Sequence, residues 1–154
     1  MQISRILIGI DDSKFADNAA AYGFSLAQKF NAHVGLVHIV EPIVSPINTN
    51  DSITGLPFGD TGINEVEMLA VQENIGENLV ERTIKKYAGD LEVTHFSEYG
   101  ATADGILHCS KEFKADLIVV GTHSRSGFDR LLMGSVAESV VRHAEVPVLV
   151  VPFQ

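Results

Sequence analysis

The chain has 154 residues, of which 45% are hydrophobic and 20% are charged, and a formal net charge of -9. This is the size and composition of one soluble globular domain spanning residues 1–154, and such acidity disfavours nonspecific binding to DNA, RNA or an anionic membrane. The apolar runs are too short to cross a bilayer, the N-terminus lacks a signal-peptide pattern, and the lone Cys109 excludes an intrachain disulfide, so we expect a cytoplasmic protein.

Five short hydrophobic runs, separated by helix-like stretches, predict an α/β fold with a parallel sheet. In chain order, the predicted strands are 5–10, 34–40, 91–97, 117–121 and 146–151. The runs lack strict alternation of apolar and polar residues, which indicates strands covered by helices on both faces. The sequence therefore predicts a doubly wound, five-stranded parallel sheet in a single domain.

The stretches between these strands have the periodicity of amphipathic helices. The predicted N-caps of the first and fourth helices are Ser13 and Ser135. The second helix is predicted to begin near Asn64, with Glu67 in a capping box, and the third near Thr102. The predicted buried stripes of the four helices are, in order, Ala16, Ala19, Ala20, Gly23, Leu26, Ala27 and Phe30; Leu69, Ile75, Leu79, Val80, Ile84 and Tyr87; Ile106, Leu107 and Phe113; and Val136, Ala137, Val140, Val141 and Ala144. Residues 41–64 are rich in Pro, Gly and polar residues and predict a long loop, either a functional lid or a mobile insertion.

The stretch from Gly121 to Ser135 follows a predicted strand and precedes a predicted helix. Glycines let an anion approach the backbone, and a helix N-terminus offers free N–H groups and a favourable dipole, so this arrangement is typical of a phosphate-binding loop. Arg125 and Arg130 add positive charge within it. An ordinary strand-loop-helix connection with two exposed arginines explains the same pattern, and spacing alone does not decide between them.

Asp11 directly follows the first strand. In an open sheet, ligands bind beyond the carboxyl ends of strands at the point where the strand order reverses. If the first strand is central, that point lies between the first and fourth strands, whose following segments hold Asp11 and Gly121. There the Asp11 carboxylate would accept hydrogen bonds from an adenine amine or a ribose, or reach a phosphate-bound metal; the alternative is a structural capping role beside Asp12 and Ser13.

Other chemistries lack a matching pattern. The chain has no Gly-x-x-x-x-Gly-Lys-Ser/Thr, no Gly-x-Gly-x-x-Gly after the first strand and no Gly-x-Ser-x-Gly. Its six histidines show no paired metal-ligand spacing, and the adjacent His108 and Cys109 would point in different directions on a helix, so no structural zinc site is predicted. His123 lies in the glycine stretch, where a protonated ring would donate to a phosphate, although a surface or packing role is commoner. We identify no positioned general base, so any hydrolysis should be slow.

Five segments of the chain resemble the universal stress proteins. These segments are 6–13, 36–40, 115–123, 130–138 and 146–151, so the resemblance extends over essentially the whole chain. Nucleotide-binding members of that family carry a Gly, two residues, a second Gly, nine residues, and then a Gly followed by Ser or Thr. Gly121, Gly134 and Ser135 match this pattern, and Ser124 replaces the second glycine.

The resemblance implies a strand order of 3-2-1-4-5 and an ATP or AMP, with Mg²⁺, held between the ends of the first and fourth strands. The site residues that it implies are Asp11 for the adenosine, the Ile39 backbone for the adenine and, for the ribose and phosphates, Gly121, Arg125, Gly127, Gly134, Ser135 and Val136. Ser124 would either crowd a phosphate with its Cβ or donate a hydrogen bond to it.

The resemblance also implies a homodimer through the final strand, 146–151, whose hydrophobic edge invites pairing with another chain. We therefore expect a stress-response protein that binds an adenine nucleotide and acts through conformation or partners rather than through turnover. Two alternatives stay open. One is a nucleotide-free dimeric interaction module in which Ser124 blocks the phosphates, and the other is a slow nucleotide hydrolase or transferase that uses Asp11 and a metal.

Overall fold

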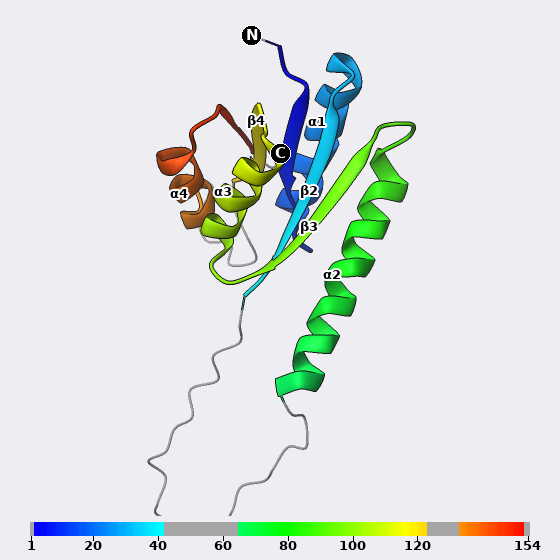
Figure 1. Cartoon of the computed structure of the whole chain (residues 1–154), viewed down its shortest axis with the longest axis vertical. Coiled ribbons are helices and arrows are strands. Elements are labelled where there is room, and N and C mark those ends of the chain that lie inside the picture. The colour runs from blue at the N-terminus through cyan, green and yellow to red at the C-terminus, as the bar shows by residue number, and fades with distance from the viewer. Residues whose placement is uncertain (1, 42–64, 123–132, 153–154) are drawn as a thin grey trace, which may run out of the picture.

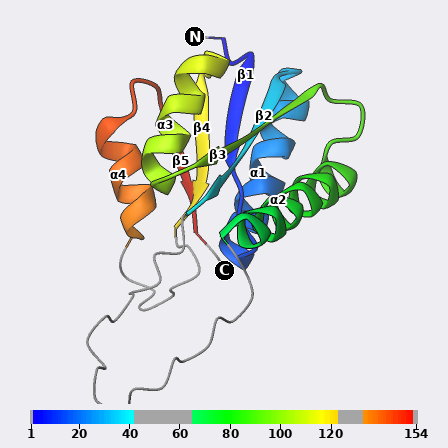
Figure 2. The same ribbon diagram turned by 60° about the horizontal axis from the view of Figure 1, so that its bottom comes forward.

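The computed structural model describes residues 2–41, 65–122 and 133–152, with the side chains of the second segment described from residue 70 onward. Five strands form one sheet: β1 (Arg5–Gly9), β2 (His33–Val40), β3 (Val93–Tyr99), β4 (Leu117–Gly121) and β5 (Val148–Val151). All neighbouring strands are parallel, and their order is β3-β2-β1-β4-β5 (Figures 1 and 2). The predicted five-stranded parallel sheet and its expected strand order are therefore confirmed.

Four helices cover the two faces of this sheet: α1 (Lys14–Phe30), α2 (Glu65–Tyr87), α3 (Thr102–Phe113) and α4 (Ser135–His143). α1 and α2 lie on one face, and α3 and α4 lie on the other (Figure 2). The predicted doubly wound arrangement is confirmed. None of the helices described here is long and apolar enough to cross a membrane.

The central strand β1 contributes to two hydrophobic clusters, one on each face of the sheet. Ile6 and Ile8 pack into the cluster formed with α1 and α2, whereas Leu7 packs into the cluster formed with α3 and α4. All three side chains have 0% exposure. Burial on both faces is the reason why these strands are apolar without alternation.

Several strand boundaries differ from the predicted ones by one or two residues, and local hydrogen bonds explain three of them. β1 ends before Ile10, whose carbonyl accepts a hydrogen bond from the His38 ring at 3.3 Å. β3 begins after Leu91, because the N–H of Leu91 donates to the Ala88 carbonyl at 3.0 Å in a turn. β5 begins after Pro147, which has no N–H to donate to the ladder.

Helix α1 begins as predicted. The Ser13 hydroxyl accepts a hydrogen bond from the Ala16 N–H at 3.1 Å, and the four alanines and the glycine of the predicted stripe are buried. Phe30, by contrast, is 50% exposed, because the helix ends there. Phe24, which the prediction left out, is buried instead and stacks on Tyr87 of α2 with ring centroids 5.9 Å apart.

Helix α2 buries Gly76 where the prediction has Ile75. Ile75 is 51% exposed, and the neighbouring Gly76 faces the sheet, where a Cβ atom would lie 2.7 Å from Cδ2 of the buried His38. Leu79 and Val80 are buried as predicted. The helix thus approaches β2 closely at a residue that has no side chain, and the larger Ile75 points outward.

The remaining predictions about the helices have mixed outcomes. Of the α3 stripe, Ile106 and Phe113 are buried and Leu107 is partly buried. Val141 of α4 is 44% exposed, because this short helix buries a narrow stripe centred on Ala137 and Val140. Residues 42–64 of the predicted loop 41–64 lie outside the described part of the chain, as do the capping box of Asn64 and Glu67 and the side chain of Leu69.

Asp116 joins the starts of the two central strands. Its Oδ2 accepts hydrogen bonds from the Ser4 N–H at 2.8 Å, the Ser4 hydroxyl at 2.8 Å and the Arg5 N–H at 2.9 Å. The hydrogen bonds from Ser4 hold the pKa of this carboxyl below its ordinary value of 3.8, because they favour the charged form.

We expect Asp116→Ala to lower the free energy of unfolding by about 1 kcal/mol at pH 7, since water screens part of the interaction. A carboxyl with a depressed folded-state pKa contributes stability above its unfolded pKa and loses that contribution as the pH falls through the folded pKa. Urea denaturation at pH 7 and at about pH 2.5 measures this. The difference between wild type and variant should be smaller at the lower pH, and a difference that is equal at both would contradict the assignment.

Candidate site at the ends of β1 and β4

The strand order reverses between β1 and β4, which are neighbours at the centre of the sheet. The chain leaves β1 for α1 on one face of the sheet and approaches α4 on the other face after β4 (Figures 1 and 2). The carboxyl ends of these strands therefore lie at the position where ligands bind in folds of this kind.

A backbone hydrogen bond closes the segment that follows β4. The N–H of Gly134 donates to the Thr122 carbonyl, and the N–H of Thr122 donates to the Val151 carbonyl of β5 at 3.1 Å. The start of α4 is thereby brought to the end of β4, so Gly121 and Gly134 lie at the same edge of the sheet. The residues between them, including the predicted site residues Ser124, Arg125 and Gly127, lie outside the described part of the chain.

Gly121 has a steric reason to be glycine. A Cβ atom there would lie 2.8 Å from both the carbonyl carbon and the oxygen of Phe15, in the first turn of α1. These are backbone atoms, which cannot move aside as a flexible side chain does. The first turn of α1 therefore packs directly on the end of β4.

The N-cap of α4 is Gly134, not Ser135 as predicted. Gly134 has φ -59° and ψ 152°, and its carbonyl accepts the first intrahelical hydrogen bond, from the Glu138 N–H at 2.9 Å. Because the hydrogen bond from Gly134 to Thr122 fixes Gly134 at the cap position, the helix begins one residue earlier than predicted. The exposed Ser135 is therefore the first helical residue.

Among the described residues, no side chain caps the start of α4. The N–H groups of Ser135, Val136 and Ala137 precede the first intrahelical bond, so the helix leaves them without an intrahelical acceptor. Glu138, the acidic residue of the first turn, pairs instead with Arg142 at 2.8 Å. These free donors and the helix dipole form an environment that favours an anion.

Asp11 lies in the turn between β1 and α1 and is partly buried. Its Oδ1 accepts a hydrogen bond from the Ser13 N–H at 2.7 Å, while Ser13 itself caps α1. The predicted structural role is thus present, since Asp11 supports the residue that caps the helix. Among the described residues Oδ2 accepts no hydrogen bond, and it therefore retains its capacity to bind a donor from a ligand.

Ile39 extends beyond the end of β1. The last pair between β1 and β2 is Gly9 with Val37, whose carbonyl accepts from the Ile10 N–H at 2.9 Å. Backbone groups two residues apart in a strand point in the same direction, so the N–H and carbonyl of Ile39 are directed toward the space past β1. The Ile39 side chain is buried against Gly105 of α3.

A groove of about 420 Å³ opens between α1 and α2 and reaches the turn that holds Asp11. Asp17 of α1 accepts hydrogen bonds from the Lys86 ammonium at 2.9 and 3.0 Å and from the Tyr87 hydroxyl at 2.9 Å. Partial burial works to raise the pKa of Asp17, but these hydrogen bonds outweigh it and hold the pKa below its ordinary value. Sequence analysis missed this groove because Asp17 and Lys86 are 69 residues apart and no local pattern joins them.

Cys109 has 0% exposure, at the interface of α3 with the sheet. Burial and the neighbouring Glu98 carboxylate raise the pKa of its thiol to about 12. The residue is therefore a protonated core side chain at neutral pH rather than a nucleophile.

The strand order of the parallel sheet and the helices on both of its faces define an open, doubly wound α/β protein. The chain belongs to the universal stress protein family, because the model of that family matches residues 2–152. It is 36% identical over 149 residues to the universal stress protein MJ0531 of Methanocaldococcus jannaschii, a match that covers 96% of this chain and 81% of the relative. The resemblance derived from the sequence motifs is thus confirmed.

Two solved structures of the same family carry nucleotides. A universal stress protein in complex with cAMP superposes with a TM-score of 0.67 at 23% identity, covering 99% of this chain and 98% of that one. The universal stress protein of Archaeoglobus fulgidus in complex with dAMP gives a TM-score of 0.61 at 17% identity, covering 97% and 98%. At these identities the comparisons establish the shared fold.

Proposed function

We propose that this chain binds an adenine nucleotide, AMP or ATP with Mg²⁺, between the carboxyl ends of β1 and β4. The observation that carries the proposal is the N-terminus of α4, which no described side chain caps and which the hydrogen bond from Gly134 to Thr122 brings to the end of β4. Free N–H groups at a helix start bind phosphate through hydrogen bonds and through the helix dipole. In this proposal Ser135 and Val136 donate to the phosphates, and Gly134 lets the oxygens approach.

The adenosine part occupies the other side of the crevice in this proposal. Oδ2 of Asp11 accepts no hydrogen bond from the described residues. In this proposal it accepts one from a ribose hydroxyl or from the adenine amine. The Ile39 backbone, directed past the end of β1, pairs with the adenine edge. Gly121, Ser124, Arg125 and Gly127 complete the phosphate side.

The ligands of the two structural relatives support the choice of an adenine nucleotide. cAMP and dAMP both contain an adenine, a five-carbon sugar and a phosphate on the 5′ carbon. A site with an acidic residue and backbone groups at one end and a helix N-terminus at the other suits that shared chemistry.

The proposed role is that of a regulator rather than an enzyme. In this proposal nucleotide binding changes the conformation at the centre of the sheet, and a cytoplasmic homodimer paired through residues 146–151 presents that change to protein partners. The exposed edge of β5 supports this pairing, because Val148, Leu149 and Val150 are only partly buried in the single chain.

Titration calorimetry of the wild-type protein with AMP and with Mg²⁺-ATP tests the proposal. We expect saturable binding with one nucleotide per chain, and about 10- to 100-fold weaker binding in Asp11→Ala, because that change removes a charged hydrogen-bond acceptor. Asp90→Ala, at an exposed turn after α2, removes the same charge away from the crevice and should bind like wild type. Equal weakening by both variants would attribute the effect to net charge and contradict the assigned site.

Ser124→Gly separates this proposal from the interaction module. Binding that appears only in Ser124→Gly would mean that the native serine blocks the phosphates and that the wild-type protein works without nucleotide. Absence of binding in both proteins would contradict the proposed function. Metal-dependent nucleotide turnover in the wild type that is lost in Asp11→Ala would favour the hydrolase instead.

A further inference from the structure

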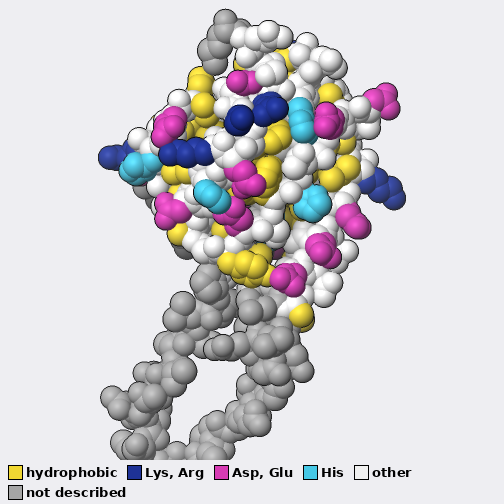
Figure 3. Space-filling model, in the orientation of Figure 1, with side chains coloured by type: hydrophobic (Ala, Val, Ile, Leu, Met, Phe, Trp, Pro, Cys, Tyr) yellow, Lys and Arg dark blue, Asp and Glu magenta, His cyan; other side chains and the backbone are white. Residues whose placement is uncertain are grey.

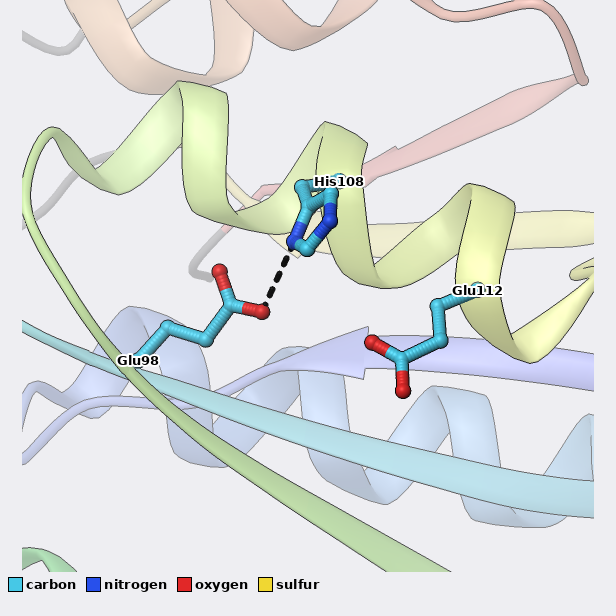
Figure 4. A group of neighbouring side chains, drawn as sticks. All are labelled: Glu98, His108 and Glu112. Carbon is cyan, nitrogen blue, oxygen red and sulfur yellow. Dashed lines mark hydrogen bonds and ion pairs between the residues drawn. The ribbon is translucent and has the colours of Figure 1, made fainter.

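Three potential metal ligands converge between β3 and α3, away from the crevice. They are Glu98 of β3 and His108 and Glu112 of α3 (Figure 4). Nδ1 of His108 lies 2.8 Å from Oε1 of Glu98, and one ligand atom from each of the three residues lies within 4.8 Å of the others.

The fold brings these residues together through two regular elements. His108 and Glu112 are four residues apart in α3, so they project from the same face of the helix. Glu98 lies two residues after Phe96, which packs into the hydrophobic cluster beneath α3, and alternation along the strand directs Glu98 to the same side. A histidine and a glutamate on successive turns of a helix, faced by a carboxylate from a strand, are thus held by secondary structure and not by a loop.

Within the cluster, His108 is the basic partner of Glu98, at 2.8 Å. Within the described ranges, no Lys or Arg forms an ion pair with Glu98, His108 or Glu112. Lys111, the nearest cation in the α3 sequence, pairs with Glu145 at 2.8 Å. Figure 3 shows histidine and acidic side chains as neighbours on this face of the molecule, and the whole chain has a net charge of -9. A divalent cation would supply positive charge beside the two carboxylates and would accept the nitrogen lone pair of the imidazole.

We propose that Glu98, His108 and Glu112 bind a divalent transition-metal ion of the zinc type. Imidazole nitrogen and carboxylate oxygen are ligands of Zn²⁺ at bonds of about 2.0–2.2 Å, whereas Mg²⁺ and Ca²⁺ prefer oxygen alone. A tetrahedral ion with such bonds separates its ligand atoms by about 3.4 Å, so small side-chain rotations suffice to close the set around it. Three protein ligands leave the fourth position to water, and the exposure of His108 gives the ion an entry path.

The bound ion would tie the edge strand β3 to α3. Glu98 and His108 are joined by a hydrogen bond at the surface, which contributes little because water competes for both groups. A metal that binds the folded chain and not the unfolded one raises stability according to its concentration and affinity. Zinc should therefore raise the midpoint of thermal unfolding.

The test is a titration of the metal-free full-length protein with Zn²⁺, followed by calorimetry and by thermal unfolding. We expect one ion per chain, a raised unfolding midpoint, and binding weakened at least about tenfold in His108→Ala, Glu98→Gln and Glu112→Gln. Far-UV circular dichroism verifies that each variant is folded. If His108→Ala does not fold, Glu98→Gln and Glu112→Gln still test the site, because glutamine keeps the shape of the glutamate side chain and removes its charge.

Two variants are matched controls. His95→Ala removes another exposed histidine of β3, and Cys109→Ala removes the soft thiol that adjoins Glu98. Both should bind Zn²⁺ within about threefold of wild type, since neither is a proposed ligand. Absence of stoichiometric binding, binding unchanged in the three ligand variants, or binding lost in either control would overturn the proposal.

Discussion

Gly134→Asp is expected to abolish nucleotide binding while the protein stays folded. Gly134 is the N-cap of α4, with φ -59° and ψ 152°, a conformation that an aspartate adopts without strain. Asp is among the best N-cap residues and differs from Gly by only a few tenths of a kcal/mol in this position. Its carboxylate would accept from the N–H groups that the proposed site offers to phosphate.

The loss of affinity should be large, because the new carboxylate both occupies the phosphate donors and repels the phosphate. We expect at least about 100-fold weaker binding of AMP and of Mg²⁺-ATP, measured by calorimetry. Asn78→Asp adds the same charge on the exposed side of α2 and should bind like wild type. Unchanged affinity in Gly134→Asp would exclude the start of α4 as the phosphate site.

Gly121→Ala should destabilise the fold by about 2–3 kcal/mol, the cost of forcing a methyl group into a close-packed contact. The added Cβ would lie 2.8 Å from the backbone carbonyl of Phe15, so α1 would have to shift away from β4. Because Asp11 lies in the turn that leads into α1, the variant should bind nucleotide more weakly as well.

Gly9→Ala is the matched control at the end of the neighbouring strand. Its Cβ would lie 3.4 Å from side-chain atoms of Ile106 and Val120 and 3.9 Å from the Val119 carbonyl oxygen, which are ordinary van der Waals contacts. We expect its free energy of unfolding to lie within about 1 kcal/mol of wild type in urea denaturation. Equal stability losses in the two variants would contradict the role assigned to the contact between Gly121 and Phe15.

The sheet was predictable because its strands are buried on both faces. Ile6, Leu7 and Ile8 have no exposed surface, and sequences under that constraint are continuously apolar and easily recognised. The α1 cap was predictable for a similar reason, since Ser13 satisfies a backbone donor through local geometry alone. The strand order, in contrast, came from the family resemblance, because strand pairing depends on contacts distant in sequence.

Contacts between elements caused the errors. Ile75 is the more hydrophobic neighbour of Gly76, yet Gly76 faces the sheet, because His38 leaves room only for a residue without a side chain. The N-cap of α4 shifted from Ser135 to Gly134 through a hydrogen bond to Thr122, twelve residues earlier in the chain. Hydrophobicity and cap preference are local properties and contain no information about either contact.

The candidate site was predictable in part. The topology brings Asp11, Gly121 and Gly134 to one edge of the sheet, as the reversal of strand order requires. The topology rule does not reveal the pair of Asp17 and Lys86 or the cluster of Glu98, His108 and Glu112. The members of each come from separate helices and strands and have no characteristic spacing in the sequence. The spacing of paired histidines, which is the usual sequence sign of a metal site, does not apply to this cluster, because it contains one histidine and two glutamates.

Nuclear magnetic resonance of the ¹⁵N-labelled protein, titrated with AMP, tests the central claim most directly. If the nucleotide binds between β1 and β4 with its phosphate on α4, the amide signals of Ile39, Gly134, Ser135 and Val136 should move and saturate together. Amide signals that stay unchanged at saturating AMP, or changes confined to Arg82 and Lys86 in the groove between α1 and α2, would contradict the proposed site.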